Sequence, residues 1–122
     1  TDMGHITAEI KDFLRGVDTA VIESNYNEEM LRTGPYPYFL KQRILSDRGH
    51  LSNEAGAQLA AFLENSGTAK LILGHLSREN NRPELALKAV GSAITSRETE
   101  LFCAPPQGFM EIKIGKEQKC LL

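Results

Sequence analysis

The sequence contains no apolar run approaching the ~20 residues that a membrane-spanning helix needs, which excludes a membrane protein of that kind. It also lacks a strong charge of one sign, because 14 Lys and Arg residues oppose 16 Asp and Glu residues for a formal net charge of -2. Proteins that bind nucleic acid non-specifically usually carry a broad basic field. Any basic surface on this chain must therefore be local.

Cysteine is scarce, since Cys103 and Cys120 lie far apart and form no Cys-x-x-Cys pair. With no signal peptide recognisable, we expect both thiols to be free in a reducing cytoplasm rather than joined in a disulfide. The chain opens on Thr1 and a dense polar motif rather than on Met, which we interpret as a cut within a larger protein.

What is present is typical of one small folded domain: 122 residues, of which 41% are hydrophobic and 25% charged. Helical spacing of apolar residues predicts a helix over 8–15, capped by Thr7 and ended by Gly16. A β-branched run over 18–23 predicts a buried strand. Residues 24–51 break the periodicity around an aromatic turn that includes Tyr36 and Tyr38, with short helices expected at 28–32 and 39–45.

The second half repeats the alternation of helix and strand. Ser52 is placed to cap a helix that reaches residue 64, and a buried strand follows at 70–74. Asn81 and Pro83 indicate the start of a helix over 84–94. Two strands are expected at 100–104 and 109–114, and residues 116–122 have the composition of an ordinary tail.

This order of elements predicts an α/β (α+β layered) domain, in which helices cover one face of a mixed sheet. It suits one half of a layered sandwich over residues 1–122. The other face of the sheet would then lack a partner, and large exposed apolar patches favour association. We therefore expect a homodimer.

Ionisable residues stand where the predicted strands and helices meet. Glu23 ends one strand, His75 follows another, His50 precedes a helix cap, and Asp2 precedes the first helix. Rigid strands position side chains at their ends while loops give access, so catalytic groups and ligands collect there. Each histidine taken alone is more often an ordinary surface or core residue, and Glu23 or Asp2 alone could be a solvent-facing charge. Together they indicate a metal site.

Five motifs strengthen this interpretation, and they resemble one family in the same order along residues 1–86. They are TDMGH at 1–5, VIESNYNEEML at 21–31, GPYP at 34–37, LKQRILSDRGHLSN at 40–53 and LGHLSRENN at 73–81. The family is the WalJ (YycJ) branch of the metallo-β-lactamase superfamily, whose members are linked to 5′-to-3′ exonuclease activity. The resemblance implies half of a metallo-β-lactamase-type αββα sandwich, the C-terminal half.

The resemblance also implies roles for individual residues. Asp2 resembles the aspartate that bridges the two metals of the superfamily, and His75 resembles the last histidine ligand. Glu23 and His50 resemble the Glu–His pair of tRNA 3′-processing nucleases, in which the histidine donates a proton to the leaving oxygen. A carboxylate that bonds one imidazole nitrogen fixes the tautomer of the ring. Asn25 and Arg48, which lie within the motifs, are candidate substrate contacts.

The resemblance further implies two divalent metal ions, Zn²⁺ or Mn²⁺, that lie ~3.5–4 Å from each other and clamp a phosphate between them. The family's His-x-His-x-Asp-His cluster is absent, and the chain contains only three histidines. Two ligands are fewer than a zinc site needs. We therefore expect the chain by itself to bind metal weakly and to be inactive, and a second copy would bring only the same ligands.

Several further residues have open roles. His5 is equally suited to the site and to a helix start, and Arg43, Arg48 and Arg78 could reach phosphates or remain solvated. Tyr36 and Tyr38 are placed to stack on bases, but we favour a structural role for them as the core of the irregular segment.

Three functions are compatible with these observations. The first is a cytoplasmic metal-dependent DNA phosphodiesterase, a 5′-to-3′ exonuclease, in the intact protein. The second is hydrolysis of a small ester, thioester or cyclic nucleotide, which a deep closed pocket would favour. The third, for this chain alone, is a folded interaction module without activity.

Overall fold

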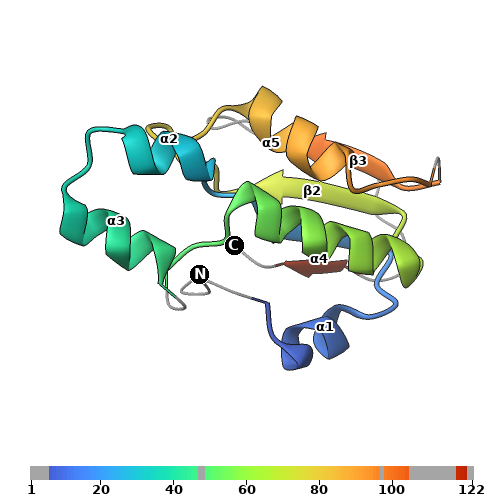
Figure 1. The fold of residues 1–122 in the computed structure, drawn as a ribbon. Helices are drawn as coiled ribbons and strands as arrows, with labels where there is room; N and C mark the ends of the chain where they lie inside the picture. The colour runs from blue at the N-terminus through green and yellow to red at the C-terminus, as the bar shows by residue number, and fades with distance from the viewer. Residues whose placement is uncertain (1–5, 47–48, 97, 105–117, 121–122) are drawn as a thin grey trace.

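The computed structural model describes residues 6–46, 49–96, 98–104 and 118–120, the last of these for the main chain only (Figure 1). Its helices and strands follow one another in chain order. They are α1 (Ala8–Leu14), β1 (Thr19–Glu23), α2 (Glu28–Thr33), α3 (Tyr38–Leu45), α4 (Asn53–Asn65), β2 (Lys70–Gly74), α5 (Pro83–Gly91), β3 (Glu100–Cys103) and β4 (Gln118–Cys120).

The four described strands form one sheet in the order β3-β2-β1-β4. All three pairings are parallel, with Glu23 opposite Gly74 at the carboxyl end of the β1–β2 pair. The predicted α/β class is confirmed, but a mixed sheet is wrong for these strands. Helices α4 and α5 each cross from the end of one strand to the start of the next, and such crossovers make neighbouring strands parallel. The strand predicted at 109–114 lies outside the described residues.

The carboxyl-terminal segment is more than a tail. Its residues 118–120 form β4 and pair with β1, with Gln118 opposite Thr19. The prediction of an ordinary tail over 116–122 is therefore wrong at this point. Three polar or small residues carry too little local pattern to predict a strand, and here the edge of β1 supplies the partner.

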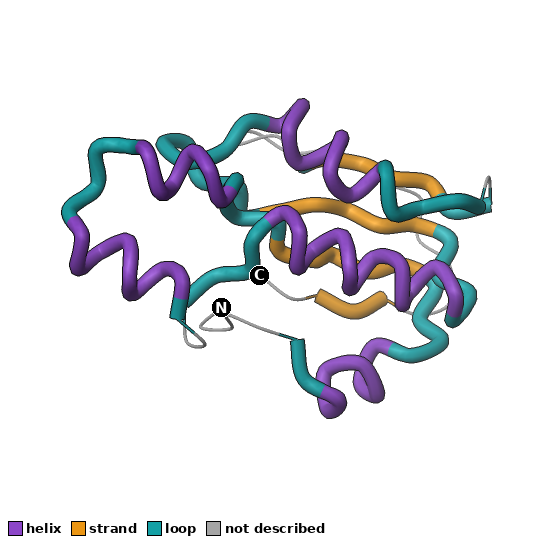
Figure 2. Tube along the Cα trace, in the orientation of Figure 1, coloured by secondary structure: helices purple, strands orange, loops and turns teal. Residues whose placement is uncertain are grey.

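Helices cover one face of the sheet, as predicted (Figure 2). Alternate strand residues point into the hydrophobic core that these helices complete, and all of its members are buried: Leu14, Val17, Ala20, Ile22, Leu59, Ala60, Leu63, Leu71, Leu73, Ala86 and Val90. Alternation places the intervening residues of the strands on the opposite face. The described layer is therefore one sheet with its helices on a single side.

Side-chain caps explain where two of the helices begin. The hydroxyl of Thr7 accepts from the N–H of Ile10 at 3.2 Å, and that of Ser52 accepts from the N–H of Ala55 at 3.0 Å, as predicted. Helix α5 begins with Pro83 in its first turn, but Arg82 is its N-cap and makes no side-chain capping bond. Asn81 was expected to start this helix, but its side chain is buried and bonds the chain after β1, as described below.

The irregular segment forms an arm, made of α2 and α3, that extends beyond the carboxyl ends of the strands (Figure 1). Leu31 is its fully buried anchor, whereas α3 contains no buried residue. Tyr38 and Phe39 are 77% and 74% exposed, so the prediction that Tyr38 forms the core of this segment is wrong. Helix α3 packs no side chain into a core, and its aromatic rings therefore lie in solvent.

Two expectations from composition can be compared with the fold. Among the described residues, no helix has both the length and the apolar character required to cross a bilayer. Cys103 is a free thiol on β3, and burial raises its pKa. The side chain of Cys120 lies outside the described part of the chain.

Candidate metal centre at the carboxyl ends of the strands

Three predicted site residues meet at one edge of the sheet. Glu23 is the last residue of β1, and His75 follows β2 directly. His50 lies between the arm and α4. The chain just before α4 runs beside the chain that follows β1, because Tyr26 and Ser52 form a parallel bridge. Because β1 and β2 are parallel, their carboxyl ends lie side by side, and residues far apart in the sequence converge.

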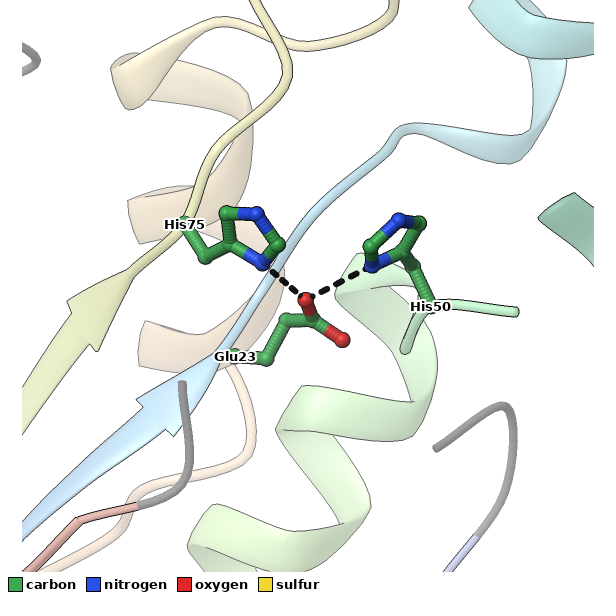
Figure 3. A group of neighbouring side chains, drawn as sticks. All are labelled: Glu23, His50 and His75. Atoms are coloured by element: carbon green, nitrogen blue, oxygen red, sulfur yellow. Dashed lines mark hydrogen bonds and ion pairs between the residues drawn. The ribbon is translucent and has the colours of Figure 1, made fainter. Parts of the chain in front are cut away.

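Glu23 bonds both imidazoles (Figure 3). Its Oε2 lies 2.9 Å from Nδ1 of His50 and also accepts a hydrogen bond from Nδ1 of His75. Its Oε1 accepts from the main-chain N–H of Leu51 at 2.8 Å. The carboxylate is fully buried, so these bonds offset the desolvation that burial of a charge would otherwise cost.

The two hydrogen bonds fix the tautomers of the histidines. An ionised carboxylate only accepts, so each ring carries a proton on Nδ1, which assigns Nε2 as the free nitrogen. In Figure 3 the second nitrogen of each ring points away from Glu23. The ring centroids of His50 and His75 are 5.0 Å apart with an interplanar angle of 73°, so the rings meet edge to face.

The chemistry of this group suits a divalent cation. Within the described residues, Glu23, His50 and His75 form the group that could hold a metal, each offering one ligand atom within 4.8 Å of the others. One carboxylate and two imidazoles are donors that Zn²⁺ and Mn²⁺ accept. A carboxylate that holds the Nδ1–H of a histidine is also the usual support for a metal bound at Nε2.

Both histidines line a pocket of about 390 Å³ between the strand ends and the arm. The arm side of the pocket carries Tyr36, Arg43 and the aliphatic chains of Leu40 and Ile44. His50 and His75 are 31% and 44% exposed, so a ligand in this pocket can reach them. An aromatic ring, a guanidinium group and two imidazoles around one pocket suit an anionic ligand that also has a flat ring.

A buried network of amides, which the sequence analysis missed, lies beneath the site. Asn53 Nδ2 donates to Asn81 Oδ1 at 2.9 Å, and Asn81 Nδ2 donates to the carbonyls of Ser24 and Asn25 at 2.9 and 3.0 Å. The hydroxyl of Ser24 donates to Asn53 Oδ1 at 2.6 Å. The sequence signal that could have revealed this network was the pair of polar residues, Ser24 and Asn25, directly after a buried strand. The network ties the starts of α4 and α5 to the end of β1.

Two glycines, also missed, allow the chain to approach the site closely. A Cβ on Gly49 would lie 2.1 Å from the carbonyl oxygen of Ile44, so only glycine fits where the arm turns back toward His50. A Cβ on Gly56 would lie 3.1 Å from the carbonyl oxygen of Glu23, so α4 packs tightly on the end of β1. Both positions fix how far the site residues stand from one another.

The remaining predicted residues divide into two groups. Asp2, His5 and Arg48 lie outside the described residues. Asn25 lines the pocket and is 7% exposed, with its amide nitrogen bonded to the carbonyl of His75. Arg78 is exposed and lines a separate apolar pocket of about 280 Å³ beside the start of α5.

Comparison of folds identifies the class of this arrangement. The structure is similar to that of the metallo-β-lactamase fold protein YhfI from Bacillus subtilis, with a TM-score of 0.54 and 17% sequence identity. The similarity covers 85% of this chain and 34% of that protein. The chain therefore has the architecture of part of a metallo-β-lactamase fold.

Sequence comparison is more specific. The chain is 48% identical over 86 residues to "Exodeoxyribonuclease WalJ" from Streptococcus pneumoniae serotype 2 (strain D39 / NCTC 7466), a match that covers 70% of this chain and 32% of that protein. It is 40% identical over 97 residues to "Exodeoxyribonuclease YycJ" from Bacillus anthracis, covering 80% of this chain and 37% of that protein. No family model matches the sequence.

The resemblance drawn from the five motifs is thereby confirmed: this is a WalJ/YycJ-like chain with a metallo-β-lactamase fold. It spans about a third of the length of the relatives it matches. Those relatives have exonuclease names.

Proposed function

We propose that this chain is the C-terminal part of a metal-dependent DNA phosphodiesterase, a 5′-to-3′ exonuclease, over residues 1–122. The observation that carries the proposal is the buried Glu23 carboxylate, which bonds two imidazoles at the edge of a metallo-β-lactamase-type sheet. The exonuclease names of the relatives support the choice of DNA as the substrate. A cytoplasmic location is part of the same proposal.

Residue roles follow from which ring nitrogen is free. Nε2 of His75 would be a metal ligand, and Asp2 would supply a carboxylate as a second ligand. Bound divalent ions, Zn²⁺ or Mn²⁺, would activate water and neutralise charge on the phosphate. His50 would carry a proton on Nε2 and donate it to the leaving oxygen. Glu23 would hold both rings by Nδ1, so it orients the ligand and the acid together.

Substrate contacts would come from the arm side of the pocket. Arg43 lines the pocket, and we propose that it and Arg48 face the phosphates of the DNA. Asn25 also lines the pocket, but its amide nitrogen is bonded to His75, so any contact it makes with DNA would use Oδ1. Tyr36 is placed on the same wall, where a base could stack on its ring.

The first prediction separates the acid from the ligand, and it needs the full-length protein. His50→Ala should lower the rate of DNA hydrolysis by roughly 10²–10⁴, the span for removal of a positioned acid or base, with the metal content nearly unchanged. His75→Ala should lose bound metal and activity together. Metal content by mass spectrometry and exonuclease assays on end-labelled DNA provide the measurements.

Two further variants complete this experiment. Glu23→Gln should weaken metal binding and lower the rate by roughly 10–100-fold, since it supports both rings. Gln58→Ala, an exposed change on α4, is the control and should alter neither property. If His50→Ala loses a metal equivalent as His75→Ala does, His50 is a ligand and the acid assignment is wrong. If no variant changes the activity, the site lies elsewhere.

We also propose that this chain alone is inactive and binds Zn²⁺ or Mn²⁺ only weakly. Among the described residues, the candidate group offers a single carboxylate and two histidines, and Glu23 is already engaged by three hydrogen bonds. A tight zinc site uses three or four ligands that are free to bind. Binding of Zn²⁺ to this chain at nanomolar concentration would contradict the proposal.

A further inference from the structure

Asn25 joins the three segments that build the site. Its main-chain N–H donates to the carbonyl of Leu51 at 2.9 Å, and its own carbonyl accepts from the N–H of Ser77 at 2.7 Å. Its side-chain Nδ2 donates to the carbonyl of His75 at 2.6 Å. One buried residue after β1 is thus bonded to the segment that carries His50 and to the segment that carries His75.

The backbone of His75 explains why a side-chain bond is needed there. His75 has a φ of 57°, and among the described residues it is the one non-glycine residue whose φ is positive. The left-handed conformation costs an L-residue roughly 1–2 kcal/mol. A continued strand would place residue 75 on the same face as Leu73, among the helix-covered residues of the core. The left-handed turn removes His75 from that alternation and brings Nδ1 to Glu23.

We propose that Asn25 is a positioning residue for His75. Its amide N–H holds the His75 carbonyl and thereby keeps the left-handed turn, which directs Nδ1 to Glu23 and leaves Nε2 facing the pocket. The consequence for metal binding and catalysis rests on the function proposed above, whereas the structural effect on the His75 ring does not. Asn25 acts through His75 and needs no contact with the substrate.

The test compares Asn25→Ala with Asn27→Ala in this chain, using imidazole ¹⁵N NMR. Asn27 is a matched control, because its side chain also makes one hydrogen bond, from the N–H of Met30 at 2.9 Å, but caps α2 away from the histidines. Asn25→Ala should change the His75 ring from a single Nδ1–H tautomer to a mixture, while the His50 ring keeps its tautomer. Asn27→Ala should leave both rings as in the wild type.

A second variant keeps the test decisive if Asn25→Ala does not fold. Asn25→Asp retains the size of the side chain but replaces the donor with an acceptor, so it should disturb the His75 ring to the same degree. An unchanged His75 tautomer in either folded variant would overturn the proposal. An equal change of both rings in Asn25→Ala would also overturn it, because that result indicates general loosening.

In the full-length protein, the expected effect of Asn25→Asp is a loss of roughly 10–100-fold in Zn²⁺ affinity and kcat, with KM for DNA unchanged. A rise in KM at constant kcat would instead indicate a direct contact with DNA and overturn the positioning role. The NMR result uses neither metal nor DNA. A protein with the predicted tautomers but no metal-dependent hydrolysis would therefore contradict the proposed function and leave the role of Asn25 standing.

Discussion

Glu23 shows how much one buried side chain can organise. It receives two imidazole N–H groups and one main-chain N–H, and no part of its side chain is exposed. A buried carboxylate is costly unless its oxygens are bonded, and here the two imidazole bonds also orient rings that line the pocket. The predicted pairing of Glu23 with His50 therefore accounts for only part of its contacts, because His75 shares the same oxygen.

Tyr26, three residues after the end of β1 and next to Asn25, yields a prediction on pH. Burial, and next the charge of Glu28, raise the pKa of its hydroxyl above the ordinary value of 10.0. The folded state therefore retains this proton where the unfolded state loses it. The associated stability is fully present below pH 10.0 and is lost as the pH rises through the folded pKa.

Tyr26→Phe should thus reduce the alkaline loss of the free energy of unfolding. Urea unfolding between pH ~8 and ~11 measures it, since an unperturbed tyrosine titrates near pH ~10. Tyr38→Phe is the control for removal of a tyrosine hydroxyl, because Tyr38 is 77% exposed and lies outside the core. Parallel curves for the wild type and Tyr26→Phe would contradict the assignment.

At the scale of elements, the contact between α4 and β1 sets the geometry of the site. Gly56 lies in the second turn of α4, where an added Cβ would stand 3.1 Å from the carbonyl oxygen of Glu23 and 3.6 Å from Cβ of Ser24. Alanine favours a helix over glycine by ~0.5–1 kcal/mol, but overpacking typically costs ~1–3 kcal/mol. Overpacking should therefore outweigh the gain in helix propensity.

We expect Gly56→Ala to lower the free energy of unfolding by about 1 kcal/mol, the difference between these two effects. Gly91→Ala in α5 is the matched control, because its Cβ would meet Leu101 at an ordinary 3.8 Å. That change should stabilise the chain or leave it neutral. Chemical denaturation of the two variants gives the comparison, and a stabilised Gly56→Ala would show that α4 can move away from β1.

At the scale of the whole molecule, one face of the sheet has no described helix. Val21, Ile72 and Phe102 are aligned across β1, β2 and β3 and alternate with the residues of the helix-covered core. In a complete αββα sandwich this face would pack on a second sheet. Ile72 is buried and the other two are partly exposed, and apolar residues on a face without a described helix favour association, so we propose that the chain forms a homodimer through it.

Light scattering tests this proposal. The wild-type chain should have the mass of a dimer at high concentration, and Phe102→Glu should shift it toward the monomer, since a charge on this face would be desolvated in the interface. Phe13→Glu is the control, because Phe13 is 56% exposed and lies on α1, away from that face. A clean monomer of the wild-type chain at high concentration would contradict the dimer.

Much of the architecture could be predicted from the sequence, because its signals are local. The capping hydroxyls of Thr7 and Ser52 act within one turn, and the β-branched run at 18–23 and the apolar run at 70–74 identify strands by composition alone. Glu23, His50 and His75 were found by their places at element ends and by motifs that resemble a known family. Local pattern and motif thus determined the α/β class and pointed to three residues that the structure brings together.

Other features depend on contacts between distant segments, and only the tertiary structure decided them. Strand β4 exists because the edge of β1 pairs with three residues that lack a strand pattern of their own. The bond from His75 to Glu23 needs the left-handed turn after β2. A histidine at position 75 does not predict this turn, because non-glycine residues rarely adopt a positive φ. From the sequence, Asn25 was predicted to contact the substrate and Asn81 to start a helix. Both support the site because folding buried their amides against main-chain carbonyls.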